Sequence, residues 1–94
     1  MAAATGAAEF EGDGLHRIRL TALHLRAALT AVDHAVSSGG AQVRRLYLVS
    51  VAGRSVADVT LADINAPTAR RIGDAIAASV GVETVSVEHL WGRP

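Results

Sequence analysis

Two hydrophobic periods alternate along the chain between residues 15 and 91. In four segments apolar side chains recur at every second position, as in a β-strand with one buried face. In two segments they recur at every third or fourth position, as in an amphipathic helix. The strand-like segments are Leu15–Thr21, Val43–Val51, Ser55–Ile64 and Val82–Leu90, and the helix-like segments are Ala22–Val36 and Pro67–Val80. The predicted order is therefore β-α-β-β-α-β.

This order is that of the split β-α-β arrangement of ferredoxin-like domains. We therefore predict an α+β fold, a ferredoxin-like βαββαβ domain in which a four-stranded antiparallel sheet carries two helices on one face. Residues 15–94 would form this single domain. Residues 1–14 are rich in Ala, Gly and acidic side chains and show no period, so we expect a flexible tail or a linker there.

Residues at the predicted helix ends agree with this division. Thr21 is the predicted N-cap of the first helix and Asn65 that of the second, with Pro67 following in the first turn. Each helix carries an apolar stripe that should face the sheet. The stripes are Leu25, Ala28, Leu29, Val32, Ala35 and Val36 in the first helix, and Ala69, Ile72, Ile76 and Val80 in the second.

The second predicted strand is apolar on both faces at its centre. Leu46 and Leu48 fall on one face, and Tyr47, Val49 and Val51 fall on the other. In an antiparallel sheet whose helices cover one face, the other face ordinarily carries polar side chains. We therefore predict that the outward residues of this strand form an interface with a partner.

Composition excludes several classes of protein. The 94 residues include no cysteine, so disulfides, thiolate metal sites and cysteine nucleophiles are ruled out. Nine arginines balance nine acidic residues, which leaves no net field that would attract nucleic acid or an anionic membrane. The third strand has no aromatic residue on which bases could stack, as an RNA-recognition motif requires. No apolar run approaches the roughly 20 residues of a membrane span, and we expect a cytoplasmic location.

Candidate catalytic and metal-binding residues are few. The histidines are His16, His24, His34 and His89. His24 and His34 are separated by roughly 15 Å on one helix, too far to share an ion. We predict no metal site, no catalytic residue and surface positions for the histidines. His89 is the exception, because it shares a strand face with Val85 and Val87 and should be partly buried. A small enzyme using His24 or His89 with a neighbouring carboxylate is the weaker alternative.

The chain resembles ACT and ACT-like regulatory domains. The resemblance covers Leu15–Leu90. It rests on the element order, on the Gly-Ala-Gln-Val segment that leads into the second strand at Val43, and on the pattern Gly-Val-x-x-Val-x-Val that begins at Gly81. It implies a non-catalytic regulatory or interaction module without a cofactor. ACT domains typically sense small effectors, such as amino acids, at interfaces between paired domains.

The resemblance also indicates where an effector would bind. Ligand-binding ACT domains usually carry an Asp-x-Pro-Gly-like loop between the first strand and the first helix. Here that place reads Thr21, Ala22, Leu23 and His24, which are the predicted effector-binding residues by position. The expected partners are a second copy, through the sheet or the helices, or an attached enzyme or transporter domain. Nucleic acid is not expected, and a membrane is expected only through a parent protein.

A narrower resemblance is to the C-terminal cytoplasmic domain of the MgtC family of magnesium-linked membrane proteins. Those domains are ACT-like, lack the glycine loop and end in a comparable strand. The segment Gly-Val-Glu-Thr-Val-Ser-Val that begins at Gly81, and the segment Val43–Leu46, fit this pattern. The alternative function is therefore that of the soluble domain of such a membrane protein.

Overall fold

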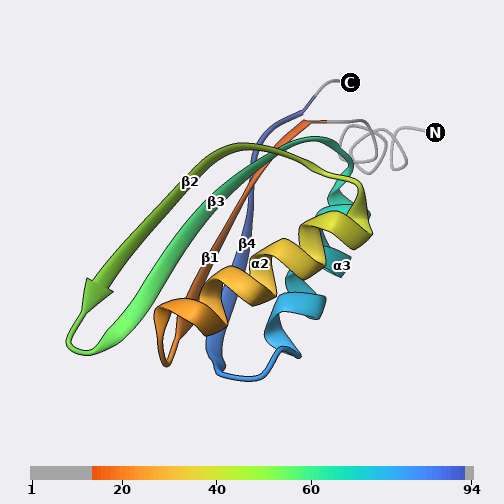
Figure 1. The fold of residues 1–94 in the computed structure, drawn as a ribbon. Helices are drawn as coiled ribbons and strands as arrows, with labels where there is room; N and C mark the ends of the chain where they lie inside the picture. Colours follow the sequence, from red (N-terminus) through yellow and green to blue (C-terminus); the bar gives the residue numbers. More distant parts are fainter. Residues whose placement is uncertain (1–13, 93–94) are drawn as a thin grey trace.

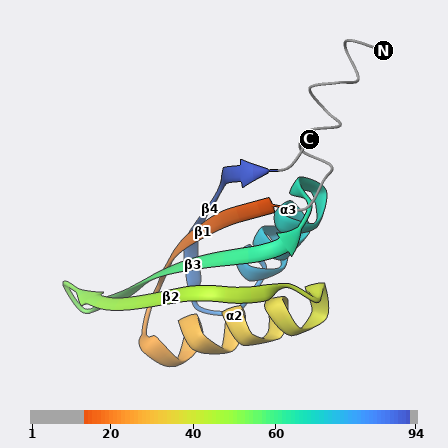
Figure 2. The same cartoon turned by 90° about the horizontal axis from the view of Figure 1, so that it is seen from above.

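The computed structural model describes residues 14–92, which form an open four-stranded sheet with two helices on one face (Figures 1 and 2). The strand order is β2-β3-β1-β4, and all neighbouring strands are antiparallel. The ferredoxin-like α+β prediction is confirmed. Residues 1–13 of the predicted tail lie outside the described residues. The elements are β1 (Gly14–Ala22), α2 (Leu25–Gly39), β2 (Gln42–Val51), β3 (Arg54–Ile64), α3 (Ala66–Ala77) and β4 (Val82–Gly92).

The core lies between the helices and the two central strands, β1 and β3. Ile18 of β1 stands opposite Val59 of β3 and Val87 of β4, so one row of side chains crosses three strands. Alternation along each strand sends every second side chain toward the helices. The buried apolar residues of these two strands include Ile18, Leu20, Ala57, Val59, Leu61 and Ile64.

The first helix begins later than predicted. Thr21 is not its N-cap, because Thr21 and Ala22 continue β1 and pair with Val56 and Ser55 of β3. His24 is the N-cap instead, and its Nδ1 accepts the backbone N–H of Ala27 at 3.2 Å. A central strand gains hydrogen bonds on both sides, and this pairing outweighs the local capping preference of a threonine.

The buried face of α2 is also rotated relative to the predicted stripe. Leu25 and Leu29 are 50% and 41% exposed, so the prediction that they face the sheet is wrong. The alanine side chains of α2 let this helix lie close to both α3 and the sheet, and the two leucines lie on the outer side of α2. The buried residues of α2 are Ala27, Ala28, Ala31, Val32 and Ala35.

The second helix follows the prediction except at its end. Asn65 is its N-cap, and its Oδ1 accepts the N–H of Thr68 at 2.9 Å. Ala69, Ile72 and Ile76 are buried as expected. Val80 is 95% exposed, and its predicted burial is wrong, because α3 ends at Ala77. Among residues 14–92, the helices are too short and too polar to cross a membrane.

Candidate functional site

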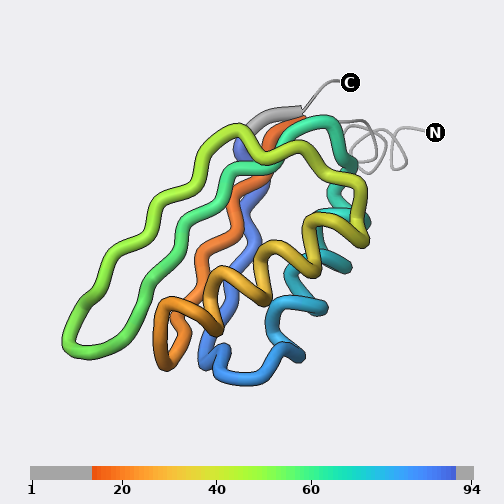
Figure 3. Tube along the Cα trace, in the orientation of Figure 1, coloured from red at the N-terminus to blue at the C-terminus, as the bar shows by residue number. Residues whose placement is uncertain are grey.

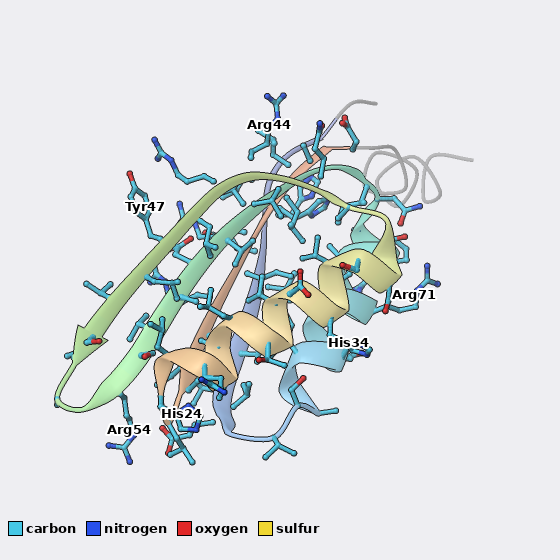
Figure 4. All side chains as sticks on the ribbon, viewed as in Figure 1. His24, His34, Arg44, Tyr47, Arg54 and Arg71 are labelled. Carbon is cyan, nitrogen blue, oxygen red and sulfur yellow. The ribbon has the colours of Figure 1, made fainter. Side chains whose placement is uncertain are left out.

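The predicted effector-binding residues lie at one end of the molecule, where β1 turns into α2. Thr21 is half-buried and Ala22 is buried, whereas Leu23 and His24 are exposed. A hydrogen bond joins this loop to the α3–β4 turn, since Leu23 donates its N–H to the carbonyl of Gly81 at 2.8 Å. Leu23 and His24 are therefore the residues of this loop whose side chains are exposed. Figure 4 shows His24 at the same end of the molecule as Arg54.

The turn between α3 and β4 packs directly against this loop. Gly81 has a φ of 87°, a conformation that favours glycine, and a Cβ placed there would lie 2.8 Å from the Cβ of Ala27. Arg54, at the start of β3, forms an ion pair at 2.6 Å with Glu83, at the start of β4. The β1–α2 loop is therefore in direct contact with the α3–β4 turn.

The predicted interface residues lie together on the sheet face that the helices leave open. Tyr47, Val49 and Val51 are each more than half exposed. Figure 4 shows Tyr47 on the side of β2 away from α2. Val49 stands opposite Val56 of β3, which extends the apolar surface inward by one strand. We call Tyr47, Val49, Val51 and Val56 the apolar strip. Figure 3 shows the β2–β3 turn beyond this strip standing clear of both helices.

Beside the apolar strip, the open face carries a group of ion pairs. Arg19 binds Asp58 at 3.0 Å, and Arg17 lies between Asp58 at 3.6 Å and Glu88 at 3.3 Å. These pairs run across β3, β1 and β4, so their charges are satisfied within the domain. The open face is therefore divided into an apolar strip along β2 and a neutral, ion-paired part beside it.

The surface prediction for His16 is wrong. His16 is 1% exposed, and its Nε2 lies 3.0 Å from the carbonyl of Ile64. A carbonyl only accepts, so Nε2 carries the proton and Nδ1 of the neutral ring carries a lone pair. Burial lowers the pKa of His16, and the neighbouring charge of His89 lowers it further, whereas the hydrogen bond to Ile64 opposes them. His16 is in phase with Ile18 and Leu20 along β1, which was the sequence signal for its burial.

His89 is half-buried, as predicted, and it contacts His16. Their Nδ1 atoms are 3.2 Å apart, and the ring centres are separated by 4.6 Å with an angle of 55° between the rings. The two residues stand opposite each other on β1 and β4. Sequence spacing could not show this pair, because the two histidines are 73 residues apart.

One pocket lies between the two helices, away from both predicted sites. It has a volume of about 270 Å³ and is lined by residues of α2 and α3, with Ser38, Thr68 and Arg71 as its polar groups. Arg71 donates to the hydroxyl of Thr68 at 3.2 Å. Figure 4 shows Arg71 projecting outward from α3. Since small-molecule sites ordinarily start at about 300 Å³, this pocket is a weak candidate for a ligand site.

The architecture and open sheet are those of an ACT-like domain. The ACT domain of GTP pyrophosphokinase from Chlorobium tepidum matches with a TM-score of 0.68 at 19% identity, over 80% of this chain and 97% of that one. The C-terminal domain of the MgtC protein from Mycobacterium tuberculosis matches with a TM-score of 0.68 at 14% identity, over 85% and 90%. A homoserine dehydrogenase from Thiobacillus denitrificans matches with a TM-score of 0.73 at 10% identity, over 89% of this chain and 19% of that one.

These likenesses confirm, at the level of the fold, both the ACT resemblance and the narrower MgtC resemblance. No protein-family model matches the chain, and the search of curated proteins found no match.

Proposed function

We propose that this chain is a non-catalytic regulatory or interaction module that pairs with a second copy through its apolar strip. The observation that carries the proposal is the exposure of Tyr47, Val49 and Val51, each more than half, side by side on β2. Large apolar side chains gathered on one face of a soluble domain mark an interaction surface. The guanidinium of Arg45 lies 5.0 Å from the ring centre of Tyr47 and adds a cation–π contact at the edge of the strip.

The fold likeness supports a regulatory role. In the homoserine dehydrogenase, the matching part is a fifth of a longer chain, and in the GTP pyrophosphokinase it is named as an ACT domain. A domain of this kind acts on an attached enzyme or transporter, whose activity changes when the domains pair. The second chain is the favoured partner because the ion-paired part of the face is neutral, and two identical neutral surfaces do not repel each other.

A matched pair of variants tests the pairing. Val49→Asp places a charge within the apolar strip, and Val80→Asp makes the same change at an exposed valine outside it. Half-burial of a valine contributes roughly 1 kcal/mol to the binding free energy. A symmetric pair buries this valine in both copies, so the substitution removes the contribution twice. Sedimentation equilibrium should therefore show association at least about tenfold weaker for Val49→Asp, with Val80→Asp like the parent. A parent that stays monomeric at millimolar concentration, or equal association of both variants, contradicts the proposal.

The effector role belongs to the β1–α2 loop. An amino acid or similar small effector would contact the exposed side chains of Leu23 and His24, because the N–H of Leu23 is already bonded to Gly81. NMR shift mapping with a panel of amino acids tests this role. Shifts confined to residues 21–24 and 81 support it, and an unchanged loop at saturating millimolar ligand overturns it without affecting the pairing proposal.

The alternative is that this chain is the C-terminal domain of an MgtC-type membrane protein. The solved MgtC domain and the solved ACT domain match this chain with the same TM-score. The length of the native reading frame separates the two possibilities. A preceding hydrophobic membrane region favours the MgtC alternative, and a preceding enzyme domain favours the ACT-type module.

A further inference from the structure

Two adjacent arginines at the start of β2 stand apart from the ion pairs of the sheet. Arg44 and Arg45 are exposed, and within residues 14–92 neither takes part in an ion pair. The other arginines of the sheet in this range, Arg17, Arg19 and Arg54, each bind a carboxylate. β2 itself has no acidic residue. Figure 4 shows Arg44 projecting away from both helices, so the start of β2 presents unpaired positive charge to solvent.

The chain has an acidic segment directly before β1. Residues 9–13 read Glu-Phe-Glu-Gly-Asp and precede the described part of the chain. Their carboxylates stand at every second position, so an extended segment would present all of them on one side. The charge of this segment is therefore opposite to that at the start of β2, and it is concentrated over a similar length of chain.

The two charged segments lie within reach of each other. Gly14 pairs with Ile64 and Gln42 pairs with Ala62, so β1 and β2 begin at the same end of the sheet (Figure 1). Only β3 lies between these strands, a separation of roughly 10 Å for two strand spacings. Five extended residues span up to about 16 Å. Because the acidic segment is covalently attached, its effective concentration at β2 is high, and contacts that are weak between separate molecules become populated.

We infer that residues 9–13 bind across the start of β2, with their carboxylates against the guanidinium groups of Arg44 and Arg45. Exposed ion pairs are individually weak, so this contact is reversible and is screened by salt. Tyr47 lies beneath the guanidinium of Arg45 and is the first residue of the apolar strip, so the bound segment covers one end of that strip. This effect on the strip rests on the proposed function, whereas the binding itself does not.

A nitroxide label beside the acidic segment tests the binding on the intact chain at dilute concentration. The chain has no cysteine, so Ala8→Cys provides a single labelling position. In about 0.01 M salt the amide NMR signal of Arg45 should broaden at least about twofold more than that of Leu90, and about 1 M salt should abolish the difference. Leu90 is the reference because β4 adjoins β1, so a segment without a binding site approaches β4 at least as closely as β2. Equal or stronger broadening at Leu90, or no response to salt, overturns the inference.

A matched pair of variants of the labelled chain shows which arginines hold the segment. Arg44→Gln with Arg45→Gln removes the charges of the proposed site, and Arg70→Gln with Arg71→Gln removes two adjacent exposed charges from α3. The first variant should lose at least about half of the broadening at Tyr47, and the second should keep all of it. Equal effects of the two variants, or broadening concentrated on α3, overturn the inference. The salt comparison needs neither variant, so it decides the question if one of them fails to fold.

Discussion

Replacing Gly81 with alanine tests whether the two loops at the candidate effector site depend on close packing. Gly81 has a φ of 87°, and its added Cβ would lie 2.8 Å from the Cβ of Ala27. The Ala27 methyl is attached directly to the backbone of α2 and cannot rotate away. Gly81→Ala must therefore strain its own backbone and also displace α2 or the α3–β4 turn.

The two effects have separable magnitudes. An L-residue in the left-handed region is destabilised by about 1–2 kcal/mol. An extra methyl in a packed contact costs a further ~1–3 kcal/mol. The sum of about 2–5 kcal/mol is a large part of the roughly 5–15 kcal/mol that stabilises a small domain.

Urea denaturation followed by circular dichroism measures the loss, with Gly53→Ala as the matched control. Gly53 has a φ of 81°, but a Cβ there meets nothing within 4 Å. Gly53→Ala carries only the backbone strain, so Gly81→Ala should lose about 1–3 kcal/mol more. Adding Ala27→Gly should recover much of that excess, measured as the coupling in a double-mutant cycle. Equal losses of stability at Gly81 and Gly53, or no coupling with Ala27, would contradict this prediction.

Three smaller predictions concern stability. The lowered pKa of His16 favours its neutral form in the folded state, so the unfolding free energy should fall as the pH drops below 6.5. His16→Gln should flatten this dependence of the unfolding free energy on pH, measured by urea titrations. An unchanged dependence contradicts a lowered pKa for His16. Ala52 and Gly53 both have positive φ, the requirement of a type I′ turn, so Ala52→Asn should raise the free energy of unfolding by about 1 kcal/mol or less. The melting temperature should rise with it, and a lower melting temperature argues against this turn type. Asn65→Ala removes the side-chain oxygen that accepts the N–H of Thr68, so the free energy of unfolding measured in urea should fall by about 1 kcal/mol. An unchanged free energy of unfolding would show that water replaces the cap.

Most of the fold was accessible from local periodicity. In β3, the buried residues Ala57, Val59 and Leu61 stand at every second position, because each strand has one face against the helices. Asn65 was recognisable as a cap because its partner, Thr68, lies three residues away and needs no distant contact.

The predictions were wrong where contacts with distant parts of the chain determine the local structure. Thr21 resembles a cap locally, yet it is held in β1 by strands on both sides. Leu25 and Leu29 are the larger apolar residues of α2, but the closeness of α3 favours the alanines beside them. The histidine pair is invisible to spacing rules because it joins the first and last strands.

The ion pairs of the open face also limit the shape of any partner. Arg17 is shared between Asp58 and Glu88, and a protein covering the whole face would have to strip water from all of these charges. A narrow contact along β2 avoids that penalty. Added salt screens the charged part but strengthens burial of the apolar strip when the anion is sulfate. Association of this domain should therefore tighten with sulfate, the reverse of an interface held by charge.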